Sequence, residues 1–383
     1  MLLLTFDLEA VAPLAFPERK PGTQFNASLP YVPGGAIFGA LGQILGAQNF
    51  DEALFRAIRC CNAYPVHQGD AWVRPLPATA IQPKGAERTD DVRDSLYARV
   101  CWEQQQPPAL IYAPADNDGR PWEAVGSKLY TIRDGNLQYR SVQQRILTRV
   151  AINRRRGTAQ EQRLYSLLAI RETTEANKQR VPTRFRGSVA LPPFAEAQVR
   201  SALTRITHLG GRQTSGLGAV RVETPETIVA PEDARQVLQR VETMTRRFRE
   251  QARLYEGLGG APWSIEGSIF TINLLADVIL LEHGWLPTQE LSAGQLKELT
   301  GIEATLLRAF TTTKLVGGWH TLWQRPKPTG VAVAMGGLYV FQTNRPLTEE
   351  GCQRLAQLQI DGIGERRAEG YGQIRICDEF HLR

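Results

Sequence analysis

The sequence predicts an α+β protein built from two domains of similar plan, and three observations support this prediction. The chain has 383 residues, which exceeds the usual size of a single hydrophobic core. A succession of helix, glycine-rich loop and alternating strand occurs twice, ending near Glu223 and near Arg383. Each half also contains an early strand followed by a segment of helical periodicity. We therefore predict domains over residues 1–223 and 224–383.

The first domain begins with the strand "LLLTFDLEA", and the segment "VPGGAIFGALGQILG" follows as a helix. Small residues such as Gly35 and Gly39 recur at helical spacing, which lets this helix lie close to a sheet. A second helix, "AEAQVRSALTRITHL", precedes the first glycine-rich loop and the strand "AVRVE". Residues from about 60 to 186 are poorly periodic and locally rich in Pro and Gln, so they predict a large insertion.

The second domain begins with a charged linker helix, which we expect over residues from about 231 to 256. A strand in "WSIEGSIFTINLL" and a helix in "LSAGQLKELTG" follow. The helix "TEEGCQRLAQLQI", with Thr348 as its N-cap, then precedes the second glycine-rich loop and the strand "QIRIC". The order of elements around both loops is therefore the same.

Composition favours a nucleic-acid partner in the cytoplasm. The formal charge is +6, the pI is about 9.1, and most of the cations are arginines, whose planar guanidinium groups bind phosphate through two hydrogen bonds. The five cysteines form no C-x-x-C pair, so we expect reduced, structural thiols and no metal site. No apolar stretch is long enough to span a membrane, and the apolar start is interrupted by Asp7 and Glu9, unlike a signal peptide.

The glycine-rich loops carry the clearest candidate site. The spacing of Gly210, Arg212, Gly216 and Gly218 recurs near the C-terminus. A dinucleotide fingerprint would need the strand before the loop and the helix after it, so this order excludes it, and no P-loop motif occurs. Glycines let a ligand approach the main chain, so loop amides and arginines could together cradle phosphates. For either loop alone, a glycine-rich turn with solvated arginines is the better interpretation, but the recurrence of Arg212 and Arg366 in register favours phosphate binding.

Several motifs together resemble the RAMP superfamily of CRISPR-associated proteins. They are "PYVPGGAIFGAL", "RPLP" at residues 74–77, "TRVAINRRRGTAQEQRLYSLLAI" at residues 148–170, and the glycine-rich loop before the last strand. Within this superfamily the Cas-five-like group, and in it the type III-D Csx-ten family, is the most similar. The resemblance implies two ferredoxin-like, RNA-recognition-motif-like domains that cap the 5′ repeat-derived tag of a CRISPR RNA (crRNA) without a cofactor.

The resemblance also implies partners and contact residues. The large Cas-ten-type subunit and backbone RAMP subunits would be the protein partners, and target RNA would be met through the complex. We expect the arginines of the insertion to act as a thumb on the RNA. The RNA-binding residues expected from the resemblance and the loops are Gly34, Gly35, Arg149, Arg154, Arg155, Arg156, Gly210, Gly211, Arg212, Gly216, Gly218, Gly364, Arg366, Arg367, Gly370, Tyr371 and Gly372.

Catalysis is not expected, although two candidates deserve a test. Some RAMP proteins cleave RNA without metal and use a histidine base, and His208 is the one histidine beside a glycine-rich loop. The alternative function is therefore a metal-independent endoribonuclease that processes CRISPR RNA. Asp90 and Asp91 form an acidic pair, but nothing near them in sequence completes a metal shell. A protein-interaction scaffold is a third hypothesis. No aromatic RNP signature is present, so base stacking on a sheet face is not expected.

Overall fold

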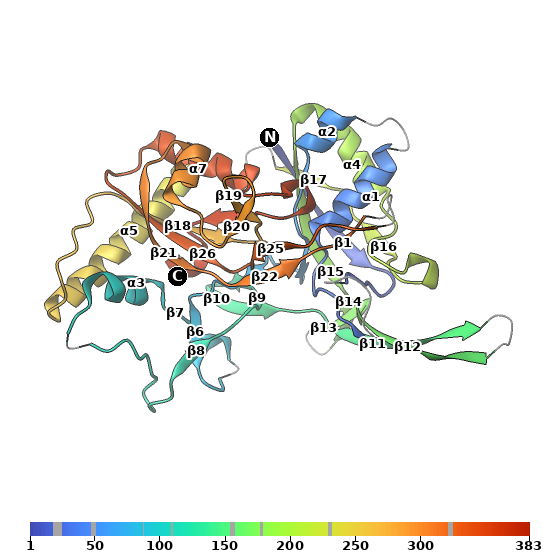
Figure 1. Ribbon diagram of the computed structural model, residues 1–383, viewed down its shortest axis with the longest axis horizontal. Coiled ribbons are helices and arrows are strands. Elements are labelled where there is room, and N and C mark those ends of the chain that lie inside the picture. Colours follow the sequence, from blue (N-terminus) through green and yellow to red (C-terminus); the bar gives the residue numbers. More distant parts are fainter. Residues whose placement is uncertain are drawn as a thin grey trace.

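The chain forms two antiparallel sheets with helices packed against them, joined by hairpins and small sheets (Figure 1). The structure is a computed structural model, and it describes residues 1–17, 25–46, 51–86, 88–108, 110–153, 158–176, 179–228, 232–320 and 325–383. This architecture confirms the predicted α+β class. The predicted division near residue 223 stays a prediction, because the arrangement of elements does not say which part folds alone.

The first sheet has the strand order β16-β1-β15-β3, with antiparallel pairing throughout. Counted along the chain, this is fourth, first, third and second strand, the arrangement of a ferredoxin-like βαββαβ unit. Every second residue of β1 from Leu4 onward is buried, as the alternating sequence requires. The elements are β1 (Leu2–Ala10), α1 (Gly34–Gly46), α2 (Glu52–Ala57), β3 (Arg59–Cys60), β4 (Tyr64–Val66), β15 (Arg184–Leu191), α4 (Glu196–Thr204), β16 (Val220–Val222) and β17 (Glu226–Ile228).

The second sheet repeats this connectivity, with the order β21-β26-β18-β27. The long helix α5 precedes it and begins with a capping box, in which Asp233 and Gln236 satisfy each other's backbone amides. Both sheets are therefore built on one topology, used twice. The elements are α5 (Ala234–Gly257), β18 (Ile269–Leu274), β19 (Leu280–Glu282), β20 (Leu286–Thr288), α6 (Ala293–Thr300), β21 (Ala304–Phe310), β26 (Leu338–Thr343), α7 (Glu349–Asp361) and β27 (Ile374–Ile376).

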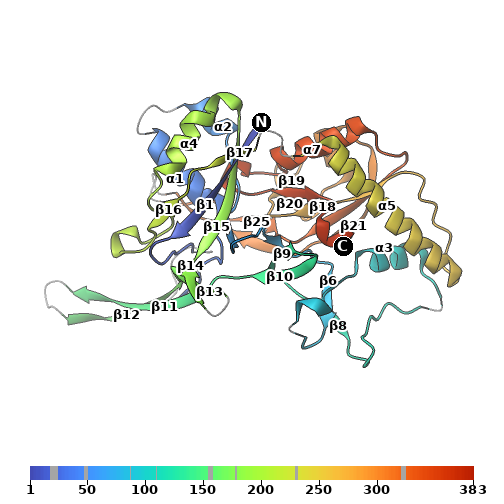
Figure 2. The same ribbon diagram turned by 180° about the vertical axis from the view of Figure 1, so that it is seen from behind.

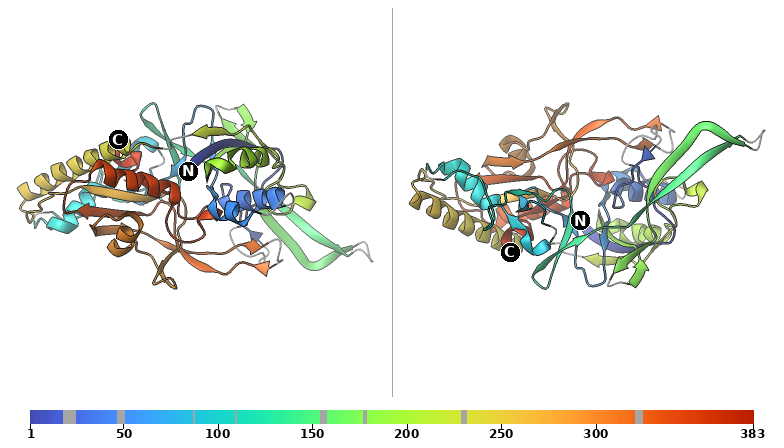
Figure 3. Two further views of the ribbon diagram at one scale, coloured as in Figure 1. Left: turned by 90° about the horizontal axis from the view of Figure 1, so that it is seen from above. Right: turned by 90° about the horizontal axis from the view of Figure 1, so that it is seen from below.

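Each unit carries an insertion between its second and third strands. In the first unit the insertion includes a long hairpin, β11 with β12, that projects from the body of the molecule (Figures 1 and 3). The insertion as a whole contains one helix, α3 (Leu96–Gln105), and ten strands: β5 (Arg74–Pro75), β6 (Ala80–Pro83), β7 (Arg93–Asp94), β8 (Trp122–Ala124), β9 (Leu129–Arg133), β10 (Asn136–Arg140), β11 (Gln144–Asn153), β12 (Thr158–Ile170), β13 (Thr173–Ala176) and β14 (Gln179–Pro182). Strand β2 (Phe25–Asn26) pairs with β12.

The insertion of the second unit is shorter. It consists of two strand pairs, β22 with β25 and β23 with β24. These strands are β22 (Thr313–Val316), β23 (Trp319–His320), β24 (Arg325–Pro326) and β25 (Gly330–Val333). Figure 2 shows the molecule from behind, with the hairpin of β11 and β12 again projecting from the body. Both insertions therefore provide antiparallel strand pairs at the same point of the topology.

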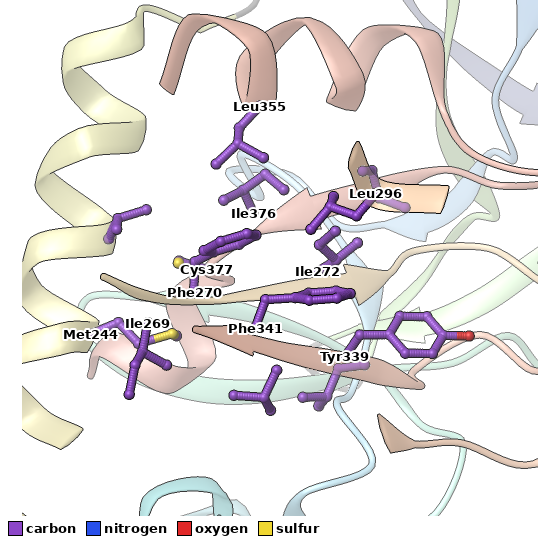
Figure 4. Packing of buried hydrophobic residues seen from close by; sticks show 14 of the residues in the cluster. Met244, Ile269, Phe270, Ile272, Leu296, Tyr339, Phe341, Leu355, Ile376 and Cys377 are labelled. Atoms are coloured by element: carbon purple, nitrogen blue, oxygen red, sulfur yellow. The ribbon is translucent and has the colours of Figure 1, made fainter. Parts of the chain in front are cut away.

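Both faces of the second sheet are covered. All six residues of β18 are buried, and Phe270 stacks on Phe341 with ring centroids 5.7 Å apart. In Figure 4, helix α7 with Leu355 lies on one side of the sheet, and the α3 helix of the first unit's insertion lies on the other. Leu96 and Val100 of α3 belong to the same core cluster as the two phenylalanines. This sheet therefore offers no open face on which RNA bases could stack.

The outer face of the first sheet is occupied by ion pairs. Arg186 forms a bidentate pair with Asp7, with both distances 2.7 Å. Arg184 pairs with Glu9 at 3.3 Å on the adjacent position. Because these are charged groups and not aromatic rings, this face also lacks a stacking platform. None of the helices in the described parts of the chain combines the length and apolar character needed to cross a bilayer.

Candidate nucleic-acid interface

The two glycine-rich loops have the same backbone conformation; we call residues 209–218 the first glycine loop and residues 363–372 the second glycine loop. Each contains an arginine in the left-handed region, Arg212 with φ 63° and Arg366 with φ 55°, which is uncommon for residues other than glycine. After each arginine comes one turn of 3-10 helix, and then a glycine with positive φ. Equivalent residues are separated by 154 positions. The repeat predicted from the sequence is therefore also a repeat of structure.

Each glycine loop is hydrogen-bonded to the segment that follows the first strand of its own unit. Four backbone amides donate to carbonyls of these segments over 2.8 to 2.9 Å, two in each loop at equivalent positions. The donor and acceptor residues are Gly218 with Pro13, Gly372 with Asp277, Gly211 with Ala15, and Glu365 with Ile279. These four loop amides are therefore engaged within the protein, and RNA contact by the loops stays a prediction.

The glycines allow the loop to pack against its own chain. A Cβ added at Gly372 would lie 1.8 Å from the carbonyl oxygen of Ile363, and one at Gly364 would lie 2.3 Å from that of Ile279. At Gly210 and Gly218 the equivalent distances are both 2.6 Å. These separations are far below van der Waals contact, so only glycine fits. The close approach that the sequence suggested for a ligand is therefore made by the protein's own backbone.

The second glycine loop faces the first unit. A Cβ on Gly34 would lie 2.7 Å from Gly370 Cα, and the Gly34 amide donates to Asn62 Oδ1 at 2.8 Å. Gly35 lies against the backbone of Glu369. The pKa of Arg59, on β3 of the first unit, is lowered mainly by burial and, to a smaller extent, by the positive charge of Arg367 in the second glycine loop. Gly34, Gly35 and Gly370, all expected to contact RNA, are therefore part of the contact between the two units.

The side chain of Arg366 is engaged within the second glycine loop. Its Nη2 donates to Glu369 Oε2 at 2.6 Å, and its guanidinium lies 4.9 Å from the ring centre of Tyr371. Lys327 Nζ donates to the same Glu369 oxygen at 2.6 Å. Burial favours the neutral acid, but the hydrogen bonds from these two cations hold the pKa of Glu369 below its usual value. Arg367 donates to the carbonyl of Asp361 at 3.3 Å.

The first glycine loop is more accessible. Arg212, Gln213 and Thr214 are exposed, and Gly216 has open space on the side where a Cβ would point. Arg149 reaches it from β11, and its Nη2 donates to the carbonyl of Ser215 at 3.0 Å. The structure therefore brings together Arg149 and the first glycine loop, two sites that the sequence analysis selected from segments more than sixty residues apart.

The remaining candidates are more isolated. His208 is exposed, and its Nδ1 lies 3.1 Å from the hydroxyl of Thr207, which is not an acid or base at neutral pH. Asp90 is exposed and lies 3.4 Å from Arg88. Within the described ranges, no group of three or more His, Cys, Asp or Glu side chains could hold a metal ion. The expected contacts Arg154, Arg155 and Arg156 lie outside the described residues.

A buried ion network near the C-terminus was not found from the sequence. Arg74, in the "RPLP" motif, pairs with Asp378 at 3.1 Å and with Glu379, and stacks 4.1 Å from the ring centre of Trp72. Arg375 binds Glu379 as well. Although burial opposes ionisation, Arg74 and Arg375 lower the pKa of Glu379 to about 2. The motif therefore joins the first insertion to the C-terminal segment, and no sequence signal paired positions so far apart.

A surface cavity of about 520 Å³ lies beside this network. Its wall includes Arg93, Arg247 and Arg383, together with Asp94. Asp94 accepts from the buried His381, at 2.7 Å from its Nδ1, and the other ring nitrogen lies 2.8 Å from Asn273 Nδ2. Arg247 donates to backbone carbonyls of residues 381–383. These bonds attach the C-terminal segment to β7, β18 and α5, and no residue of either glycine loop lines the cavity.

Comparisons with known proteins find only distant similarity. No protein-family model matches the sequence, and no curated protein matches it. A chain from a cryo-EM structure of the Type III-B Cmr-beta bound to cognate target RNA and AMPPnP is 11% identical, with a TM-score of 0.41, covering 89% of this chain and 86% of that one. A chain of a Type IV-B CRISPR complex is 13% identical, with a TM-score of 0.26, covering 60% of this chain and 92% of that one. Neither value assigns the chain to a family.

Proposed function

We propose that this chain is a non-catalytic RNA-binding subunit of a type III CRISPR effector complex, and that it caps the 5′ repeat-derived tag of the crRNA. The sequence resemblance to Cas-five-like RAMP proteins, closest to the Csx-ten family, supports this proposal through the motifs quoted above. It also suggests the large Cas-ten-type subunit and the first backbone subunit as partners, with target RNA met through the assembly.

One observation carries the proposal: the hydrogen bond from Arg149 to the carbonyl of Ser215, which joins the projecting hairpin to the first glycine loop. It unites an exposed arginine on the loop, Arg212, with a hairpin that extends from the body. Guanidinium groups on an accessible surface bind phosphates without reading sequence. The second sheet is covered on both faces, and the outer face of the first sheet carries ion pairs. The surface formed by the first glycine loop and the projecting hairpin is therefore the better candidate for RNA contact.

The direct test is RNA binding by the purified protein. A labelled RNA carrying the repeat-derived tag should bind, and its affinity should fall steeply between about 50 and 200 mM salt, because bound phosphates release counterions. A scrambled tag of equal length serves as the control for specificity. Affinity that does not change with salt would contradict the proposal. Sequencing of RNA that copurifies with the protein should then reveal a common 5′ repeat fragment.

The endoribonuclease alternative is kept because His208 is exposed next to the first glycine loop. A metal-independent mechanism requires a base and usually a second group that protonates the leaving oxygen. The same RNA, incubated with the protein in EDTA, distinguishes the two functions. Cleavage that disappears in His208→Ala would favour the nuclease, whereas intact RNA would favour the binding subunit.

A further inference from the structure

Two arginines in the wall of the cavity near the C-terminus donate to the same neutral oxygen. Arg93, on β7, donates through Nη1 to the carbonyl of Val92 at 3.1 Å. Arg383 donates through Nη2 to that same carbonyl at 2.8 Å. Burial lowers the pKa of Arg383, and the positive charge of Arg93 acts in the same direction, although the charge of Asp94 opposes both. The cavity wall therefore holds two guanidinium groups side by side.

The other contacts of these two guanidinium groups are with uncharged groups. Arg93 also donates to the backbone carbonyl of Asp90, at 2.6 Å. Arg383 also lies over the ring of Phe380, 4.9 Å from the ring centre. Among the residues that the structure describes, neither arginine forms an ion pair with an Asp or Glu side chain. A guanidinium has five N–H donors, so most donors of this pair are not used by the described part of the chain.

The carboxylates that line the cavity have partners of their own. Asp94 accepts from the amide of Leu96 through Oδ1 at 3.1 Å and from His381 through Oδ2 at 2.7 Å. Asp90 lies 3.4 Å from Arg88, which does not line the cavity. Like charges held this close repel each other, so an anion placed between the two guanidinium groups would stabilise both.

The cavity has the size of a small-molecule site and lies apart from the surface proposed for RNA. Its volume of about 520 Å³ falls in the range of roughly 300–1,000 Å³ that is usual for ligand pockets. Thr89 and Asn136 add a hydroxyl and an amide to its wall. In Figures 1 and 2 the C-terminus and the hairpin of β11 and β12 lie on opposite sides of the molecule. A small ligand therefore fits this position better than a strand that follows the hairpin.

We propose that this cavity binds a nucleotide, whose terminal phosphate is held between Arg93 and Arg383. A terminal phosphate carries about −1.5 to −2 charges at pH 7, whereas a carboxylate or a phosphodiester carries a single charge. Two adjacent guanidinium groups match the larger charge, and each can bind two phosphate oxygens. Thr89 and Asn136 provide donors and acceptors for the sugar and base. The site goes beyond the proposed RNA-binding function and does not depend on it.

The test is isothermal titration calorimetry of the full chain at about 150 mM salt, where weak surface attraction is screened. The probes are the four common nucleoside triphosphates, inorganic triphosphate and adenosine, without divalent cations, which would compete for the phosphates. At least one nucleoside triphosphate should bind more tightly than inorganic triphosphate, and adenosine should not bind. Arg93→Ala and Arg383→Ala should each weaken nucleotide binding about 10- to 100-fold, the usual effect of losing charge-assisted hydrogen bonds.

Matched variants separate the two arginines from the general positive charge. Arg246→Ala removes an exposed arginine of α5 that does not line the cavity, and it should leave the affinity within about twofold of the wild type. Asp90→Asn removes a negative charge from the wall, so nucleotide binding should be equal or tighter. Arg93→Lys keeps the charge but loses the planar group that binds two oxygens, so its affinity should lie between those of the wild type and Arg93→Ala.

The outcomes that overturn the site differ from those that overturn the proposed function. Wild-type protein that binds no nucleoside triphosphate, or equal losses in Arg246→Ala and Arg93→Ala, would overturn the site. Inorganic triphosphate that binds as tightly as every nucleotide would overturn the nucleotide assignment. If Arg93→Ala also weakened binding of the tag RNA, and this RNA displaced the nucleotide, the cavity would belong to the RNA surface. Thermal unfolding checks the variants; if Arg383→Ala lowers the midpoint, the exposed Arg93 decides.

Discussion

Replacing the buried Gly372 with alanine should strongly destabilise the second glycine loop. The residue has φ 74°, and an added Cβ would lie 1.8 Å from the carbonyl oxygen of Ile363. The same two residues are hydrogen-bonded, since the amide of Ile363 donates to the carbonyl of Gly372 at 2.9 Å. The amide of Gly372 donates to Asp277 O at 2.8 Å. The alanine therefore cannot be accommodated unless this pairing opens.

The magnitude follows from two contributions. A left-handed conformation costs an L-residue about 1–2 kcal/mol. The loss of two backbone hydrogen bonds adds about 0.5–1.5 kcal/mol for each bond. We therefore expect Gly372→Ala to lower the free energy of unfolding by about 2–5 kcal/mol. Gly216→Ala is the matched control, because Gly216 has φ 81° but nothing within 4 Å of an added Cβ, so only the conformational cost of about 1–2 kcal/mol applies.

Urea unfolding followed by circular dichroism measures both free energies under one set of conditions. If Gly372→Ala were no more destabilising than Gly216→Ala, the packing argument would be refuted. Full stability with lost RNA binding in both variants would instead indicate that the glycines serve a ligand. The experiment thus decides whether these glycines are needed by the fold or by the RNA.

Three further predictions concern charged side chains. The pKa of Glu379 is lowered from 4.5 to about 2, so its ion pairs stabilise the fold fully above pH 4.5 and are lost as the pH falls towards 2. Glu379→Gln should therefore flatten the decline of unfolding free energy over that range, and the exposed control Glu365→Gln should not. The double variant Arg366→Ala with Arg367→Ala should lower the unfolding midpoint. Because Arg366 already pairs with Glu369, the slope of log RNA affinity against log salt should stay unchanged. A slope reduced by about 1.4, equivalent to two phosphates, would show that these arginines do bind RNA. His208→Ala should leave the RNA affinity within about twofold of the wild type and, in EDTA, should leave the RNA intact, as should the wild-type protein.

The repeated pattern of glycine and arginine was enough to predict that the two loops share one conformation. Backbone conformation is a local property, and glycines with positive φ report it directly in the sequence. What the loop packs against is not local. The acceptors of the loop amides, such as Pro13 and Asp277, lie far from the loops in sequence, so the pattern alone left open whether the amides face a ligand or the protein.

The charges were harder to interpret from the sequence. Arg366 and Arg212 look equivalent in an alignment of the two loops, and Arg366 is the more conspicuous because Arg367 follows it. Only the position of Lys327, 42 residues from Glu369, explains why a carboxylate in the second glycine loop is fully matched by cations. The buried partners of Arg74 lie about three hundred residues away in the sequence, so they too could not be predicted from it.

The insertion that covers the second sheet has a consequence for synthesis of the protein. The ribosome makes α3 and its neighbouring strands long before β18, β26 and β27, so the cover emerges before the surface it must cover exists. Leu96, Val100 and Cys101, all fully buried in the finished molecule, stay exposed on the nascent chain during that interval. A nascent chain that stalls after α5 would therefore be prone to aggregation. A chaperone that binds exposed apolar helices should raise the yield of folded protein.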